Sequence, residues 1–399
     1  MEHKLHGLSL IKKGYSIKKL GAVIFFSTIA FALASTVWAL YIRSFLPNDA
    51  IVGLVSSFFI LISIISYFLI IPLVESSDKY RLLIGSSIMI VVGYFLYSIT
   101  HSFILFLILA SIMAFLGAIR ASALGLLVRS NSKKKALSKN EGFIYTLANV
   151  SSLIGPLLVS FLLFEAGLKN VFLVASLFLL FSVLLLKFSK INPGEKRKSL
   201  HKKVLINFLG FFKDKHRVKA YFLRVGVTFW WSLVYIYIPL LMIKTLKIFW
   251  VGIFLAVVTI PLIFLEYPFG KLASKRGYRK LFFMGFLIPA IFSLLCFLFY
   301  QNIYFILASI TLASIGLAML EANTEAYFFD ITKGKEEQRY YPPYNTSIDA
   351  GHMIGRLAGF LVLFLFPFKY IFLVYFGVNI FLAILSLSIK EVIEQKKKN

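Results

Sequence analysis

The chain has 399 residues, of which 59% are hydrophobic and only 15% are charged. Soluble domains are about 45–50% apolar, so this composition excludes a soluble protein and indicates one that crosses a membrane several times. The formal net charge of +26 would suggest a nucleic-acid partner in a soluble protein, but here the charges fall between long apolar runs and we expect none.

The apolar runs predict the membrane-spanning helices. Each is about twenty residues long, which is the length that a helix needs to cross a bilayer. The first run is longer than the apolar part of a signal peptide and has no A-x-A cleavage site, so it is a span. The twelve predicted spans are 19–43, 50–73, 81–99, 103–128, 141–164, 170–189, 218–243, 248–272, 280–300, 303–328, 342–367 and 369–389.

The positive charges predict the orientation in the bilayer. Most of the 43 Lys and Arg residues fall in the segments that share a side with the N-terminus. The opposite side carries only Arg43, Lys169, Lys244, Lys247 and Lys369. The positive-inside rule therefore places both termini in the cytoplasm of a multi-pass cell-membrane protein. Contact with anionic lipid is a natural consequence of this charge.

The longest polar interruption, from Lys190 to about Lys219, separates six spans from six. It predicts an N-terminal bundle (1–190), a cytoplasmic linker (191–217) and a C-terminal bundle (218–399). Apolar residues recur at helical spacing among the linker lysines and predict an amphipathic helix in the membrane interface. These residues are Val204, Leu205, Phe208, Leu209, Phe211 and Phe212. We interpret the helix as a tether on anionic lipid, with a regulatory contact as the alternative.

Short repeats indicate that the two halves arose by duplication. The five residues Ile108–Ile112 in the fourth span recur as Ile306–Ile310 in the tenth, at an offset of 198. Two further pairs follow at the same or nearly the same offset: Tyr80-Arg81 with Tyr278-Arg279, and Ile154-Gly155 with Ile354-Gly355. Three correspondences in chain order favour a repeated six-helix unit.

Small residues mark helix faces that pack closely. Span five carries Ser151 followed by Gly155-Pro156, and span eleven carries Gly351, Gly355 and Gly359 at intervals of four. Such small-xxx-small stripes let two helix backbones approach each other. The pattern fits a static contact and a moving interface equally well.

A basic segment from Gly270 to Lys280 lies between spans eight and nine and predicts a tight turn. Together with twelve spans, cytoplasmic termini, a long middle loop and the repeat, it resembles the major facilitator superfamily, whose signature reads G-x-L-A-D-R-x-G-R-K. The matching or similar positions are Gly270, Leu272, Ala273, Lys275, Gly277 and Arg279. Ser274 replaces the aspartate of the signature.

The resemblance covers essentially the whole chain and implies an all-α membrane protein of two pseudo-symmetric six-helix bundles around a central cavity. It also implies secondary transport by alternating access. Gly155-Pro156 is similar to part of the G-x-x-x-G-P motif of antiporters in the family, with Ser151 at its first position. Arg120 resembles the arginine of a proton-antiporter motif, without the rest of that motif. Because Ser274 lacks a charge, we expect gating or coupling in buried carboxylates elsewhere.

Ionisable side chains inside spans are costly and are therefore functional candidates. They lie in the spans that the resemblance places around the cavity, whereas spans three, six, nine and twelve have no charge in their interiors. The candidates for proton coupling or gating are Arg120, Arg224, Glu266, Glu321, Glu325, Asp349, His352 and Arg356.

Glu321 and Glu325 are one helical turn apart and share a face. Two carboxylates on one face in a low dielectric cannot both ionise cheaply, which suits a proton relay. The alternatives are a cytoplasmic gate, in which each carboxylate pairs with Arg120 or Arg224, and direct contact with substrate. His352 is one turn from Asp349 and from Arg356, which allows either pH sensing or a packed, hydrogen-bonded role.

Aromatic residues in spans one, five and seven are candidates to line an amphipathic cavity. They are Trp38, Tyr145, Trp230, Trp231, Tyr235 and Tyr237. Most aromatic side chains in such a chain face lipid or core, so each has packing as its alternative. Trp250 is interpreted as an anchor at the membrane interface.

These observations predict a transporter and no enzyme, cofactor or metal site. We expect a monomeric carrier of a small organic solute, coupled to protons, with a lipid or drug exporter as the alternative. The chain has no G-x-x-x-x-G-K-[ST] loop and hence no ATPase of its own. A membrane-embedded lipid-modifying enzyme would need a paired-Asp motif or an H-E-x-x-H metal site, and the sequence has neither.

Overall fold

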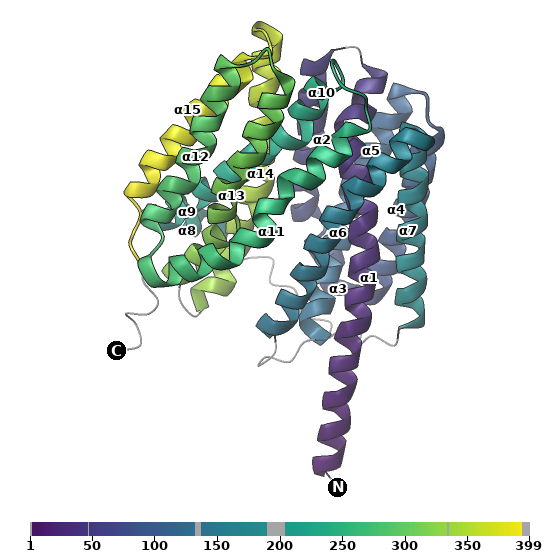
Figure 1. Ribbon diagram of the computed structural model, residues 1–399. Coiled ribbons are helices and arrows are strands. Elements are labelled where there is room, and N and C mark those ends of the chain that lie inside the picture. Colours follow the sequence, from purple (N-terminus) through teal and green to yellow (C-terminus); the bar gives the residue numbers. More distant parts are fainter. Residues whose placement is uncertain (1, 47, 132–136, 190–203, 333–334, 393–399) are drawn as a thin grey trace. The chain divides into compact units, whose positions relative to one another are not determined.

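The computed structural model describes residues 2–46, 48–131, 137–189, 204–332 and 335–392, and these residues form helices without any strand (Figure 1). Eleven of the described helices are long and apolar enough to cross a membrane. A further apolar stretch, Asn149–Glu165, is shorter. The prediction of an all-α membrane protein is confirmed. The eleven spans are Lys18–Phe45, Asp49–Leu69, Lys79–Ile99, Phe103–Val128, Leu168–Phe188, Lys215–Met242, Trp250–Arg276, Arg279–Leu298, Ile303–Ile331, Arg339–Leu365 and Tyr370–Leu387.

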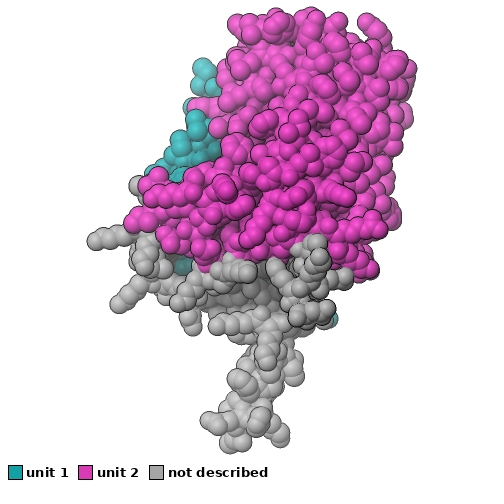
Figure 2. Space-filling view, turned by 90° about the vertical axis from the view of Figure 1, so that its left-hand side faces the viewer, with its two compact units in different colours: residues 1–45, 61–201 teal, residues 46–60, 202–399 magenta. Residues whose placement is uncertain are grey.

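The chain divides into two compact units (Figure 2). Unit 1 holds residues 1–45 and 61–201, and unit 2 holds residues 46–60 and 202–399. The expected boundaries placed residues 46–60 in the first bundle, whereas the structure groups them with unit 2. The physical reason is direct bonding, because Arg356 Nη1 donates to the carbonyl of Ser56 at 3.1 Å.

Unit 1 consists of the end of α2 and the six helices α1 (Glu2–Phe45), α3 (Ile71–Ser76), α4 (Lys79–Ile99), α5 (Phe103–Asn131), α6 (Leu137–Glu165) and α7 (Leu168–Phe188). α2 itself runs over Asp49–Leu69. Helix α1 packs against α6 and α7, and α4 packs against α5 and α7. Asp78 caps α4 by accepting from the backbone N–H groups of Tyr80 and Arg81, which fixes where this span starts.

Unit 2 contains the start of α2 and nine further described elements. Eight are α-helices and one, η3, is a π-helix. Their bounds are α8 (Val204–Phe212), α9 (Lys215–Ser232), η3 (Leu233–Tyr237), α10 (Ile238–Met242), α11 (Trp250–Arg276), α12 (Arg279–Leu298), α13 (Ile303–Ile331), α14 (Lys335–Leu365) and α15 (Tyr370–Leu387).

The packing within unit 2 repeats the packing within unit 1. Helix α9 packs against α14 and α15 as α1 packs against α6 and α7, and α12 packs against α13 and α15 as α4 packs against α5 and α7. Helices α4 and α12 begin at residues 79 and 279, and α5 and α13 begin at residues 103 and 303. The duplication predicted from short repeats is thus visible in the helix arrangement of each unit.

The small-residue faces lie at equivalent helix pairs. In unit 1, Ser151 Oγ of α6 donates to the carbonyl of Phe25 in α1 at 3.1 Å, and a side chain at Gly155 would collide with Ala32. In unit 2, a Cβ atom at Gly355 of α14 would lie 2.7 Å from Ser232 Cβ of α9. Gly351 meets the same helix, and Pro156 is buried within α6. These positions allow the close helix contacts that the sequence predicted.

The basic segment between spans eight and nine differs from the prediction of a turn over Gly270–Lys280. Helix α11 continues through Gly270, Leu272 and Lys275 to Arg276, and α12 begins at Arg279. The residues after Gly270 are mostly good helix formers, so they extend α11. The helix ends at Gly277, whose φ of 84° suits glycine.

The short connection after α11 is bonded to neighbouring parts of unit 2. Tyr278 Oη donates to Asp330 Oδ2 at 2.7 Å. Arg279 donates to the carbonyl of Ile389 at 3.0 Å and forms an ion pair of 3.6 Å with Glu391. Ser274, which replaces the acid of the signature, donates to the carbonyl of Lys271 in its own helix. The carboxylate that pairs with Arg279 therefore belongs to Glu391, in the segment after α15.

Candidate functional site

A buried polar cluster lies inside unit 2, where α9 and α14 pack together and α13 packs against α9 and α11. Its centre is Arg224 of α9. Arg224 Nη1 donates to the backbone carbonyl of Glu321 at 2.7 Å and contacts Thr324 Oγ1 at 3.4 Å. The guanidinium is therefore fixed on the backbone of α13, rather than on a carboxylate.

The Glu321 carboxylate has a different partner. Glu321 Oε2 accepts a hydrogen bond of 2.9 Å from the indole N–H of Trp231. Trp231 is 7% exposed, and its ring centroid lies 5.6 Å from that of Tyr235. A buried indole N–H needs an acceptor, and here the acceptor is an ionisable group. The two aromatic side chains thus form one wall beside Glu321.

Tyr235 lies four residues after Trp231, on the same helix face, in a stretch where the backbone is irregular. The π-helix η3 ends at Tyr237, two residues before Pro239. Proline has no N–H, and its ring clashes with the carbonyl four residues earlier, which here belongs to Tyr235. The wider π turn relieves that clash, and π turns inside α-helices are frequent at functional sites. The sequence signal for this irregularity was the proline inside an aromatic span.

Glu325, one turn after Glu321, is bonded to α14. Glu325 Oε1 accepts from Tyr341 Oη at 2.7 Å. Tyr344 Oη donates to the carbonyl of Thr324 at 2.9 Å, and its ring stacks on Phe328 with centroids 4.1 Å apart. Tyr341 and Tyr344 were missed by sequence reasoning. The available signal was their spacing of three residues around Pro342-Pro343, near the start of a span.

The charges in this cluster are unbalanced. Arg224 interacts electrostatically with Glu321 and Glu325, and Glu266 of α11 interacts with Glu321 and Arg224. Among the described residues, three carboxylates therefore interact with the guanidinium of Arg224 within the span region of unit 2. The structure brings together four of the predicted charged residues here, and two of the predicted aromatic residues, Trp231 and Tyr235, beside them.

A second set of polar side chains lies along α14. Ser232 Oγ of α9 donates to the carbonyl of His352 at 3.0 Å and lies 3.5 Å from its Nδ1. Asp349 and Arg356 interact electrostatically with each other. Among the described residues, the Nε atom of Arg356 is buried without a hydrogen-bond partner. Asp349, His352 and Arg356 thus form a chain of polar side chains along one helix.

The start of α2 is seated on this part of unit 2. Tyr237 Oη and Arg356 Nη1 donate to the carbonyls of Arg356 and Ser56, respectively. A Cβ atom at Gly53 would lie 2.8 Å from the Arg356 carbonyl, so only glycine fits there. At the first residue of α2, Asp49 Oδ2 forms an ion pair of 2.6 Å with Lys244 Nζ.

The remaining predicted residues have other surroundings. In unit 1, Arg120 is 9% exposed and lies 4.5 Å from the ring centroid of Phe31. Trp38 packs on Phe106 at 5.7 Å. In unit 2, Trp230 is fully buried and packs on Tyr375 at 6.2 Å. The side chain of Tyr145 lies outside the described residues.

Comparison with known families identifies the fold. The family model described as the Major Facilitator Superfamily matches residues 20–260 and 222–399. The chain belongs to the major facilitator superfamily. This superfamily consists of membrane transporters and not of enzymes, so the chain is a multi-pass membrane protein with a secondary-transporter fold.

Solved structures of the superfamily agree with this assignment. A POT family transporter in complex with 5-aminolevulinic acid matches with a TM-score of 0.75 at 12% identity, over 93% of this chain and 95% of that one. The POT family transporter PepTSo matches with a TM-score of 0.72 at 13% identity, over 93% and 97%. A peptide transporter POT in complex with sulfate matches with a TM-score of 0.72 at 11% identity, over 93% of each. No curated protein matches the sequence.

Proposed function

We propose that this superfamily member moves a small organic solute across the cell membrane by alternating access and couples that movement to protons. It acts as a monomer with both termini in the cytoplasm. The observation that carries proton coupling is the cluster around Arg224, where Glu266, Glu321 and Glu325 face a single guanidinium. Carboxylates that crowd one another in a low dielectric cannot all remain ionised, so at least one of them holds a proton.

Glu321 is the carboxylate that we propose as the proton carrier. The indole N–H of Trp231 donates a hydrogen bond to Glu321. The ionised carboxylate can accept this bond, and so can the carbonyl oxygen of the protonated acid, so the bond persists in both states. Arg224 is anchored on the backbone carbonyl of the same residue and stays in place in either state. Protonation therefore changes the charge beside Trp231 and Tyr235 without removing the contacts that position it.

The same cluster indicates the chemical class of the solute. Aromatic side chains from α9, η3 and α14 surround an excess of carboxylates, which favours a solute with an amino group and an apolar portion. Two of the structural neighbours are described as complexes with 5-aminolevulinic acid and with a thioalcohol-conjugated peptide, respectively. Both bound molecules are small organic solutes, in line with this proposal.

A conformational element is also available for alternating access. Helix α2 is continuous over Asp49–Leu69, and its first part is held in unit 2 by Lys244, Tyr237 and Arg356. We propose that this seat opens and closes during the cycle. The contacts consist of one ion pair and a few hydrogen bonds, whose small individual energies suit a reversible contact.

The test begins with the solute. A thermal-shift screen of the purified protein against amino acids, short peptides, lipophilic cations, sugars and organic acids identifies a ligand. That ligand is then offered to proteoliposomes with an imposed pH gradient. The proposal predicts accumulation that a protonophore abolishes. Equal accumulation with and without the gradient would show that transport is not proton-coupled.

A further inference from the structure

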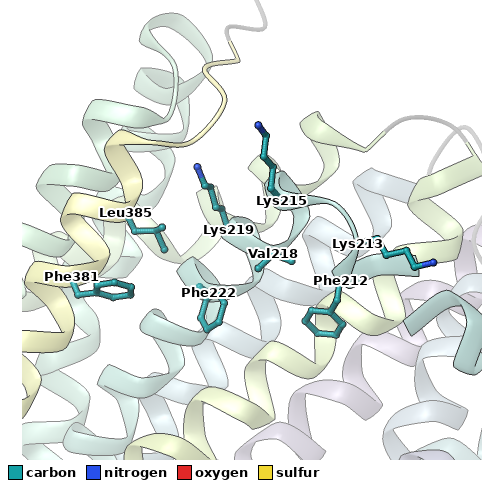
Figure 3. Close-up of a pocket in the computed structure, with 8 residues that line it drawn as sticks. All are labelled: Phe212, Lys213, Lys215, Val218, Lys219, Phe222, Phe381 and Leu385. Atoms are coloured by element: carbon teal, nitrogen blue, oxygen red, sulfur yellow. The ribbon is translucent and has the colours of Figure 1, made fainter. Parts of the chain in front are cut away.

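A groove of about 400 Å³ opens on unit 2 between the start of α9 and the end of α15 (Figure 3). It lies apart from the polar cluster around Arg224 and takes no part in the proposed transport chemistry. Its lining combines two kinds of side chain, lysines and apolar residues that are mostly aromatic. The lining includes Lys213, Lys215, Lys219, Phe212, Phe222 and Phe381.

The rim of the groove is positively charged. Lys213 and Lys215 are exposed. In Figure 3 the Lys215 and Lys219 side chains extend in the same direction, whereas Lys213 extends away from them. Lys219 Nζ donates to the carbonyl of Ser388 at 2.7 Å, which leaves two of its three N–H donors for a ligand. Among the residues that the structure describes, no acidic side chain lines the groove. The rim therefore offers several donors to an anion.

The acid nearest in sequence, Asp214, is engaged elsewhere. Its carboxylate caps α9 by accepting from the backbone N–H groups of His216 and Arg217, both at 2.9 Å. Burial alone would raise the pKa of Asp214, but the Arg217 N–H, the Arg217 charge and the His216 N–H together hold that pKa below its ordinary value. Asp214 thus remains a cap and leaves the lysine charges available.

The wall of the groove is apolar. Phe222 of α9 is 47% exposed and Phe381 of α15 is 61% exposed. Phe212, at the end of α8, adds a third partly exposed ring. Aromatic side chains of membrane helices that are not covered by protein face acyl chains. An ammonium rim beside such a wall fits a molecule with an anionic head and an apolar tail.

The depth of the groove supports the same ligand. The span in α9 begins at Lys215, and the span in α15 ends at Leu387, so the lysines lie at the level where spans meet headgroups. The adjacent helix α8 exposes Ile206 and Leu209, as expected of a short helix that lies on a membrane.

We propose that this groove binds one anionic phospholipid, with its phosphate on Lys215 and Lys219, Lys213 adding positive charge to the rim, and an acyl chain along Phe222 and Phe381. The proposal rests on the membrane location of the superfamily and is independent of the solute and of proton coupling. The phospholipid is preferred to free phosphate because free phosphate would leave the aromatic wall unused.

The test is a binding titration of the full-length protein in neutral detergent, read by native mass spectrometry. The probes are phosphatidylglycerol, phosphatidylcholine and inorganic phosphate. The groove variant carries Lys213→Gln, Lys215→Gln and Lys219→Gln. The matched control carries Lys271→Gln, Arg276→Gln and Lys280→Gln, which remove the same charge at the α11–α12 connection of the same unit. A third variant, with all three groove lysines replaced by arginine, keeps the charge.

The proposal predicts one tightly held phosphatidylglycerol on the wild type, the control and the arginine variant. The groove variant should bind it about a hundredfold more weakly, because each lysine near the surface contributes roughly a fivefold effect. Equal binding by the groove variant and the control, at equal melting temperatures, would overturn the proposal.

A second pair of measurements distinguishes the lipid from free phosphate. Phe222→Ser with Phe381→Ser should weaken phosphatidylglycerol binding and leave any phosphate binding unchanged. Millimolar inorganic phosphate should not displace the lipid. Displacement by phosphate together with no effect of the two serine substitutions would assign the site to a free anion and contradict the lipid proposal.

Discussion

At the scale of single residues, the hydrogen bond between Trp231 and Glu321 is the contact on which the proposed coupling depends most. Charged residues inside apolar spans stand out in a sequence, and Arg224, Glu266, Glu321 and Glu325 were found in this way. Their partners were harder to predict. A tyrosine such as Tyr341 carries no signal in a chain that is 17% aromatic, and only the packing of α13 on its neighbours assigns it to Glu325.

The first prediction concerns Trp231→Phe, which keeps an aromatic ring and removes the N–H donor. A hydrogen bond to a charged group contributes about 1.5–3 kcal/mol, and about 1.4 kcal/mol corresponds to tenfold. We therefore expect proton-coupled uptake to fall at least about tenfold in proteoliposomes. The control is Trp230→Phe, because the Trp230 N–H has no partner among the described residues. Equal losses of uptake in the two variants would remove the special role of the indole of Trp231.

The second residue-scale prediction concerns Asp214 as the cap of α9. Asp214→Ala should lower the stability of the protein by about 0.5–2 kcal/mol, whereas Asp214→Asn keeps a good cap and stays near the wild type at neutral pH. Because the pKa of Asp214 is lower in the folded state, its charge contributes stability above its unfolded pKa of about 3.9 and loses it as the pH falls through the folded value.

Melting temperatures measured in detergent as a function of pH test this cap. The melting temperature of the wild type should fall more at acidic pH than that of Asp214→Asn, because the variant has no carboxylate to protonate at this position. Identical acid profiles for the two proteins would mean that the Asp214 charge does not contribute.

At the scale of elements, the apolar runs predicted the spans closely, because about twenty apolar residues have few alternatives to a membrane helix. The irregular elements were not predicted. The expected turn over Gly270–Lys280 is mostly the end of α11, since its basic residues are also good helix formers. The π-helix η3 depends on how the backbone relieves the clash between the Pro239 ring and the carbonyl of Tyr235. Hydropathy does not reveal this.

The seat of α2 in unit 2 gives the prediction at this scale. The side chains of Asp49 and Lys244 are 12% and 48% exposed, and a pair of this kind contributes about 0.2–1 kcal/mol. Asp49→Asn or Lys244→Gln should therefore change the transport rate by roughly 1.4-fold to fivefold. Lys247→Gln, at a neighbouring exposed lysine, is the matched control.

A charge swap distinguishes the ion pair from general charge effects. The double variant Asp49→Lys with Lys244→Asp should restore most of the wild-type rate. It should not restore all of it, because the contact between the Lys244 ammonium and the Phe368 ring is lost. If each single variant is impaired and the swap is no better than their combined effect, the pair does not gate the cycle.

At the scale of the whole molecule, the repeat is the feature that sequence and structure share most clearly. Three short correspondences predicted two six-helix units, and each unit packs its helices in the same order. The sequence did not predict that residues 46–60 belong with unit 2. Contacts between segments that are distant in the sequence cannot be read from a hydropathy pattern. The fold of the superfamily is thus kept at 11–13% identity to the solved transporters compared above.

The central claim is that the carboxylates around Arg224 couple solute movement to protons through Glu321. The most direct measurement is solute-linked proton uptake in proteoliposomes, followed with an internal pH dye, for the wild type, Glu321→Gln and the exposed-acid control Glu165→Gln. We predict that Glu321→Gln still exchanges solute across the membrane but moves no protons with it, whereas Glu165→Gln behaves as the wild type. Unchanged proton uptake in Glu321→Gln would contradict the account.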